Sequence, residues 1–255
     1  MMRLPICNRV LMCSILFFLS IIYCTNGFAE PDLKSIIERY QAEYNRPFYG
    51  RMEMRRVKPG KEDRVSVFAV WMKGQDYSLV KFLAPVREKG TAFLKNKDQM
   101  YFYLPSVAKV IRISGSQRIL DSDFSGANLL GMDLTADYNY ELEGDGLIDG
   151  VDHYIIVFKA KNRTATYDRV KLWLRKNDEF PKKEEFYTSS GKLLQVLTYD
   201  NFVTIGGYQR VKKMTMQNAL VSGQYTIVTL LEANYDQQIS DEIFTQLNLK
   251  RSLKE

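Results

Sequence analysis

The chain has 255 residues and a formal net charge of +6, with 45% hydrophobic residues. This length is sufficient for one domain with a sizeable core. Its basic residues are spread along the sequence, which favours a solvated surface over nucleic-acid binding. All three cysteines lie at or before Cys24, so the rest of the chain has no disulfide framework, thiolate nucleophile or cysteine metal site.

Residues 1–29 have the composition of a secretory signal peptide. Two arginines precede the apolar run Val10–Tyr23, which is too short for a comfortable transmembrane helix. We expect cleavage after Ala29, because small residues stand at its −3 and −1 positions. Lipidation of Cys24 is a less favoured alternative, since Tyr23 stands where a small residue normally precedes the cysteine. The exported chain, residues 30–255, is then a single domain of 226 residues with 34 basic and 30 acidic side chains.

One helix is predicted over residues 30–46. Leu33, Ile36, Ile37 and Tyr40 recur at helical spacing, and Pro47 ends the helix. From Phe48 onward the apolar period becomes two, with turn residues about every 8–12 positions. We expect about ten or eleven strands in total, followed by a short last helix that begins near residue 240.

Three of these strands are apolar on both faces: Val65–Met72, Tyr77–Leu83 and Met100–Leu104. An antiparallel strand with one face in water should alternate cleanly between apolar and polar residues. These strands therefore need cover on both sides, from a helix, a second sheet or a bound apolar ligand.

Residues 100–130 interrupt the all-β pattern. The first strand breaks at Pro105, a second covers Val107–Ile113, and a polar and aromatic segment then leads into Ala127–Leu130. We interpret residues 121–130 as a lid. The predicted fold is mainly β: an incomplete antiparallel β-barrel capped by the N-terminal helix and this mid-chain lid segment.

Few residues could carry catalysis or bind a metal. His153 is the single histidine, and no Gly-x-Ser-x-Gly elbow accompanies it, so an ordinary strand histidine is favoured over a Ser-His-Asp catalyst. The acidic residues of 141–149 lack the EF-hand spacing and are more typical of turns than of a calcium site. Asp121 and Asp123 are more easily explained as helix caps than as an acid/base pair. We expect no enzymatic activity, no metal and no cofactor.

Several short runs resemble a known family. Arg112-Ile113-Ser114-Gly115 and Ser122-Asp123-Phe124-Ser125 resemble the outer-membrane lipoprotein-sorting (LolA-like) proteins of bacteria. Ile148-Asp149-Gly150, Leu172-Trp173 and Glu185-Phe186-Tyr187 are similar to that family's later strands. The resemblance implies an unclosed β-barrel in the periplasm whose apolar cavity carries lipid, or the acyl chains of lipoproteins, toward the outer membrane. It also implies an outer-membrane acceptor and, as for some relatives, an inner-membrane RND-type exporter as partners.

The side chains expected to line such a cavity belong to the doubly apolar strands and the lid: Phe68, Val70, Met72, Phe82, Phe102, Phe124, Leu129 and Leu130. The same residues could instead be ordinary core, and the sequence leaves these two interpretations nearly even. A second function also stays open, in which the fold is a sensor or binding module that recognises a lipidated or peptide partner without transport.

Overall fold

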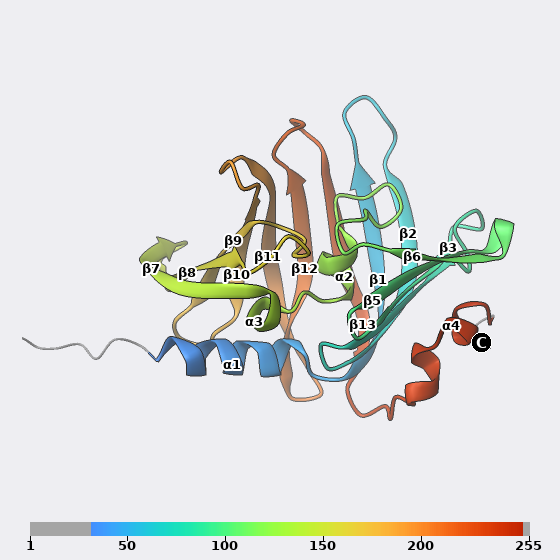
Figure 1. Ribbon diagram of the computed structural model, residues 1–255, viewed down its shortest axis with the longest axis horizontal. Helices are drawn as coiled ribbons and strands as arrows, with labels where there is room; N and C mark the ends of the chain where they lie inside the picture. Colours follow the sequence, from blue (N-terminus) through green and yellow to red (C-terminus); the bar gives the residue numbers. More distant parts are fainter. Residues whose placement is uncertain (1–31, 252–255) are drawn as a thin grey trace, which may run out of the picture. The chain divides into compact units, whose positions relative to one another are not determined.

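A computed structural model describes residues 32–251, which form one antiparallel sheet of thirteen strands (Figure 1). The predicted signal peptide lies outside the described residues. The strands are β1 (Phe48–Val57), β2 (Arg64–Lys73), β3 (Tyr77–Ala84), β4 (Ala92–Asn96), β5 (Gln99–Leu104), β6 (Lys109–Ile113), β7 (Tyr138–Ile148), β8 (Val151–Ala160), β9 (Arg169–Arg175), β10 (Pro181–Tyr187), β11 (Leu193–Ile205), β12 (Tyr208–Asn218) and β13 (Tyr225–Asn234).

The sheet is open. Its strand order is β6-β5-β4-β3-β2-β1-β13-β12-β11-β10-β9-β8-β7, so the first and last strands pair with each other in the middle and β6 and β7 form the two edges. This arrangement confirms the predicted incomplete barrel. There are thirteen strands, against the ten or eleven expected.

One hairpin differs from the prediction. The acidic residues of 141–149 were expected to lie in turns, but β7 runs on to Ile148 and turns only at Asp149-Gly150. A register shift between Leu142 and Gly144 absorbs one residue as a bulge. Bulges and glycines are tolerated there because β7 is an edge strand with a neighbour on one side only.

Helix α1 (Leu33–Tyr44) packs on one face of the sheet, which we call the inner face. The Asp32 side chain caps the helix by accepting a hydrogen bond from the Ser35 backbone N–H at 3.3 Å. Ile36, Ile37 and Tyr40 are buried in the main hydrophobic cluster, together with inner-face residues such as Phe68. The helix ends at Asn45, slightly before the predicted end.

The mid-chain insert connects the two edges of the sheet. Strands β6 and β7 follow one another in the chain but lie at opposite edges, so residues 114–137 must cross between them. The crossing contains α2 (Gly126–Leu130) and α3 (Leu134–Asp137). Phe124 and Leu130 are fully buried in the main cluster. Much of the segment interpreted as a lid is therefore part of the core.

Ser125, rather than either aspartate, caps α2. Ser125 Oγ accepts a hydrogen bond from the Asn128 N–H at 3.3 Å, and Asn128 Oδ1 accepts one from the Ser125 N–H at 3.1 Å. This reciprocal pair is a capping box. The predicted caps were wrong because Asp121 is exposed and ion-paired, while Asp123 is buried against β12 and β13.

The variant Ser125→Ala is expected to lower the free energy of unfolding by about 1 kcal/mol, the usual contribution of an N-cap side chain. Urea denaturation followed by circular dichroism would measure the change. Ser189→Ala, in the exposed turn between β10 and β11, is the control and should change stability by less than about 0.5 kcal/mol. Equal effects of the two substitutions would contradict the assigned capping role.

The C-terminal segment covers the outer face of the doubly apolar strands. It contains the 3₁₀ turn η2 (Asp241–Phe244) and α4 (Gln246–Leu249). Phe244 and Leu249 form a second hydrophobic cluster with Leu79 and Leu94. The predicted need for cover on both sides is thus confirmed, and on this side the cover is the chain itself. No helix within residues 32–251 has the length and apolar character needed to cross a membrane.

Two buried lysines connect strands β3 and β4 to the short helices α4 and α2. Lys81 Nζ donates to the carbonyls of Asn248 and Arg251, at 2.7 and 2.9 Å, and Lys95 Nζ donates to the Gly131 carbonyl at 2.8 Å. Burial lowers the pKa of Lys81 to about 8. Cations are favourable at helix C-termini, where carbonyls lack partners. Each lysine interrupts an apolar strand because it caps a helix that covers that strand.

Candidate functional site: an apolar pocket under the first helix

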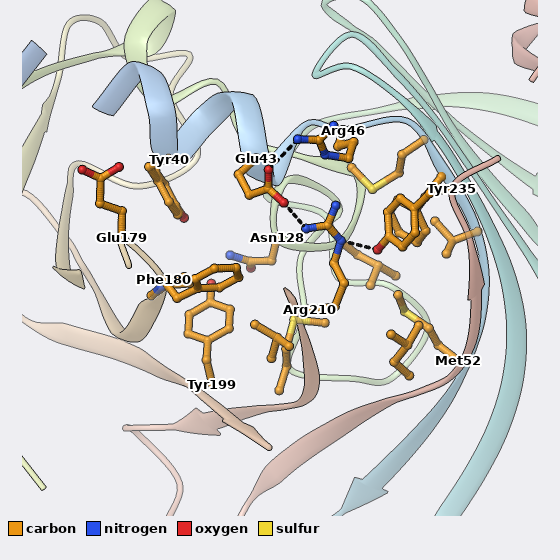
Figure 2. A pocket seen from close by; sticks show the side chains of 18 of the residues that line it. Tyr40, Glu43, Arg46, Met52, Asn128, Glu179, Phe180, Tyr199, Arg210 and Tyr235 are labelled. Atoms are coloured by element: carbon orange, nitrogen blue, oxygen red, sulfur yellow. Dashed lines mark hydrogen bonds and ion pairs between the residues drawn. The ribbon is translucent and has the colours of Figure 1, made fainter. Parts of the chain in front are cut away.

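A cavity of about 130 Å³ lies between α1 and the inner face of the sheet (Figure 2). Its walls come from β1, β2, β12, β13, α2 and the turn before β10. The apolar lining residues are Phe48, Met52, Phe68, Val70, Met72, Leu129, Phe180, Pro181, Val211, Met214 and Leu230. Such a lining with a few polar groups is typical of a site for an apolar ligand.

The size of the cavity limits what it can hold as it stands. A cavity of about 150 Å³ accommodates one benzene molecule. The pocket therefore has room for a short hydrocarbon segment, and a long acyl chain requires its walls to move. Three of the walls carry methionines (Met52, Met72 and Met214), whose flexible side chains adapt readily to irregular shapes.

A charged cluster forms one wall of the pocket. We call Glu43, Arg46, Arg210 and Tyr235 the rim cluster. The Glu43 carboxylate accepts hydrogen bonds from Arg46 Nη2 at 2.7 Å and from Arg210 Nη1 at 2.5 Å, while Arg210 Nε donates to the Tyr235 hydroxyl (Figure 2). Burial raises the pKa of Glu43, but the hydrogen bonds from the two arginines outweigh it and hold that pKa below its ordinary value. Glu43 is therefore a carboxylate at neutral pH.

The two guanidinium groups of the rim cluster also stack on aromatic rings. Arg46 lies 4.1 Å from the centroid of Tyr208, and Arg210 lies 4.3 Å from the centroid of Tyr235. Such cation–π contacts favour one orientation of each guanidinium plane.

A second ion pair fastens α1 to the sheet. Arg39 Nε lies 2.9 Å from Glu179 Oε2, at the turn before β10. The first helix is thus held by apolar side chains on its buried side and by the Arg39–Glu179 and Glu43–Arg210 contacts at the pocket. A shift of the helix would have to break these ion pairs and expose its buried apolar side chains.

A buried carboxyl group lies beside the pocket. Glu184, on β10, is 5% exposed and accepts a hydrogen bond from the Tyr199 hydroxyl at 2.7 Å. Burial raises the pKa of Glu184 to about 7, although hydrogen bonds from Tyr199 and Tyr40 oppose the shift. Its strand neighbours are Leu172 and Leu197. Glu184 is thus a carboxyl group poised to change charge near neutral pH.

The structure brings half of the predicted cavity residues to this pocket: Phe68, Val70, Met72 and Leu129. Phe82 and Phe102 lie farther along the inner face, where adjacent ring centroids in the series Phe68–Phe82–Phe93–Phe102 are 5.5, 6.3 and 4.8 Å apart. Phe124 and Leu130 are core residues without exposure. Ligand binding by any of the eight residues stays a prediction.

Sequence patterns alone did not reveal the rim cluster or the contribution of β12. Alternation places Arg210 on the same face of β12 as Met214 and Met216, but it does not show that this face lines a pocket. The sequence places Glu43 on the first helix, but its partner Arg210 lies 167 positions away in the chain.

His153 is a buried residue of β8. The side chain is 1% exposed, and its Nδ1 lies 2.8 Å from the Val151 carbonyl of the same strand. The His153 side chain faces away from the pocket. Odd and even positions of β8 lie on opposite faces, and the even positions Ile156 and Phe158 lie on the inner face. Among residues 32–251, no group of three or more His, Cys, Asp or Glu side chains is placed to hold a metal ion.

Comparison with known proteins agrees with this fold. A family model described as "-like: Uncharacterized protein" matches residues 74–251. A LolA superfamily protein from Nitrosomonas europaea has a TM-score of 0.76 and 29% identity, over 84% of this chain and 98% of that one. A DUF1329 family protein from Desulfovibrio piger has a TM-score of 0.75 and 27% identity, over 84% and 96% of the two chains.

A domain assigned to outer membrane lipoprotein sorting, from Vibrio parahaemolyticus, has a TM-score of 0.77 and 24% identity, over 85% of this chain and 97% of that one. None of the curated proteins matches the sequence. The open antiparallel sheet with its helix-covered inner face and these relatives lead to the same assignment: the chain belongs to the LolA-like family.

Proposed function

We propose that this protein is a periplasmic carrier. It shelters a lipid, or an acyl chain of a lipoprotein, in the pocket under α1 and delivers it toward the outer membrane. The observation that carries this proposal is the apolar, methionine-rich cavity beneath α1. The name of the Vibrio parahaemolyticus relative, which refers to lipoprotein sorting, supports the direction of transport.

The energetic reason for a carrier is the cost of exposing hydrocarbon to water. Each methylene removed from water contributes about 0.8 kcal/mol, so a long acyl chain leaves a membrane only rarely unless a protein receives it. The binding is non-covalent and needs no bond-making step. Admission of a long chain requires α1 to move away from the inner face, which enlarges the cavity.

The first test is to identify what the protein binds. Protein purified from the periplasm without detergent should show bound lipid by native mass spectrometry, and a fluorescent fatty acid should bind to the delipidated protein. A protein that is always empty and never binds the probe would contradict the proposal.

The second test blocks the cavity. Leu230→Trp places a large ring in the pocket, where Leu230 is 6% exposed, and should weaken binding of the fatty acid at least about tenfold, equivalent to excluding two methylenes. Leu231→Trp is the matched control, because Leu231 is 52% exposed and does not line the pocket. Met214→Trp tests the same wall if Leu230→Trp fails to fold.

Delivery is tested in cells. Deletion of the gene should reduce the amount of the identified lipid or lipoprotein in the outer membrane, and the wild type should restore it where Leu230→Trp does not. An unchanged envelope with altered stress signalling would favour the sensor function instead. If delivery is observed, cross-linking from α1 would identify the inner-membrane exporter and the outer-membrane acceptor that we propose as partners of the carrier.

A further inference from the structure

The rim cluster has more positive than negative charge around its centre. One carboxylate, Glu43, lies between the guanidinium groups of Arg46 and Arg210. The other acidic residue of the pocket wall, Glu179, is engaged with Arg39. The rim cluster therefore carries one net positive charge at the edge of an apolar cavity.

Two donors of this cluster are buried without a hydrogen-bond partner: Arg46 Nε and Arg210 Nη2. A buried N–H group without an acceptor is costly, and native proteins satisfy nearly all such groups. Stacking on Tyr208 and Tyr235 holds the two guanidinium planes in place, so their donor forks are preorganised. Such forks match the paired oxygens of a carboxylate or a phosphate.

We propose that the ligand of this pocket ends in an anionic group, a carboxylate or phosphate, and that Arg46 and Arg210 bind this group in place of Glu43. This inference deepens the proposed carrier function and rests on it. The hydrocarbon chain lies in the apolar pocket, and the anion lies at the rim cluster.

Glu43 then acts as an internal substitute for the ligand's anion. Its carboxylate comes from α1 and occupies one donor on each arginine. An incoming anion that displaces it also breaks the contact between α1 and Arg210, which belongs to β12. Binding of the anion and release of the helix are thereby coupled, whereas a neutral ligand leaves the Glu43–Arg210 contact in place. A cluster that only fastened α1 would show no preference between the two ligand types.

The test uses three ligands with the same hydrocarbon chain: dodecanoate, dodecyl phosphate and dodecanol. Each displaces the neutral dye N-phenyl-1-naphthylamine from the delipidated full-length protein. We expect at least one of the anions to bind about tenfold more tightly than dodecanol, as a hydrogen bond to a charged group allows. The stronger of the two anions indicates whether a carboxylate or a lipid phosphate is recognised.

The variants separate anion recognition from pocket binding. Arg210→Gln should reduce the ratio of anion to alcohol affinity to near one, and Glu43→Gln should raise that ratio. Arg51→Gln controls for the loss of one positive charge, because Arg51 is exposed on the outer face and lies 3.8 Å from Glu232. Arg46→Gln gives the same reading as Arg210→Gln if the latter does not fold.

The outcomes distinguish the two proposals. Equal binding of all three ligands to the wild type, with a ratio that Arg210→Gln leaves unchanged, would overturn the anion site and leave the carrier function intact. Failure of all three ligands and of the dye to bind would overturn the carrier function, and the anion site with it.

Discussion

Replacement of Asp123 by alanine is expected to lower the free energy of unfolding by about 3–5 kcal/mol. Asp123 is 1% exposed, and its carboxylate accepts hydrogen bonds from Thr226 Oγ1 at 2.9 Å, Asn218 Nδ2 at 3.2 Å and Gln224 Nε2 at 2.6 Å. These partners belong to β12, β13 and the turn between them. The alanine leaves all three donors without their acceptor, and two of them, on Asn218 and Thr226, belong to buried side chains.

The network explains how the mid-chain insert is held inside the sheet. The backbone of Asp123 takes part as well, since its N–H donates to Thr226 Oγ1 and its carbonyl accepts from Gln195. Loss of the carboxylate should therefore loosen residues 118–125. Hydrogen exchange would show this as faster exchange of the Phe124 and Gly126 amides, which bond to backbone or side-chain oxygens within the insert.

Asp121→Ala is the matched control, two positions away in the same segment. Asp121 has a side chain that is 54% exposed, and it pairs with Lys58 and Arg64 at the surface. Such exposed ion pairs contribute at most about 1 kcal/mol. Urea denaturation of both variants would measure the difference, and a loss from Asp123→Ala no larger than that from Asp121→Ala would show that the buried network does not hold the insert.

The second large effect concerns Glu184 and depends on pH. Burial places the pKa of this carboxyl group at about 7 in the folded protein, against an ordinary value of 4.5 for a glutamate. Between these two values the folded chain keeps a proton that the unfolded chain has released. The stability of the wild type should therefore fall as the pH rises from about 4.5 to 7, by up to about 3 kcal/mol.

Glu184→Gln removes this loss, because the amide stays neutral at every pH and retains an oxygen for the Tyr199 hydroxyl. The variant should match the wild type near pH 4.5 and exceed its stability above pH 7. Urea unfolding at pH 5, 6, 7 and 8 measures the divergence. Glu185→Gln, on the opposite face of the same strand, controls for the loss of one negative charge. Parallel pH profiles for the wild type and Glu184→Gln would contradict the raised pKa.

Most of the fold could be predicted because strands and turns have local signatures. β1 begins at Phe48, where the apolar period was predicted to change to two, and β2 contains the predicted strand Val65–Met72. The last residues of β7 were missed because glycines in an edge strand resemble a turn. Lys81 is a visible exception in an apolar strand, but its helix partner lies far away in the chain.

The candidate site was predictable only in part. Phe68, Val70 and Met72 share one face of β2 by simple alternation, so the sequence grouped them correctly. It could not tell that this was the inner face, because the other face of β2 is also apolar and packs under the C-terminal segment. Nor could it separate residues that line the pocket from residues such as Phe124 that fill the core.

The sequence by itself determined the type of most elements, the apolar stripe of α1 and the interruption after β6, because each depends on residues within a turn or two of one another. The tertiary structure alone decided the pairing of β1 with β13, the path of residues 114–137 between the two edges, and the meeting of Glu43 with Arg210. The two contacts join positions more than a hundred residues apart, and the path of the insert depends on where the two edges of the sheet lie. No local pattern encodes them, and they become visible only once the sheet has formed and α1 lies across its inner face.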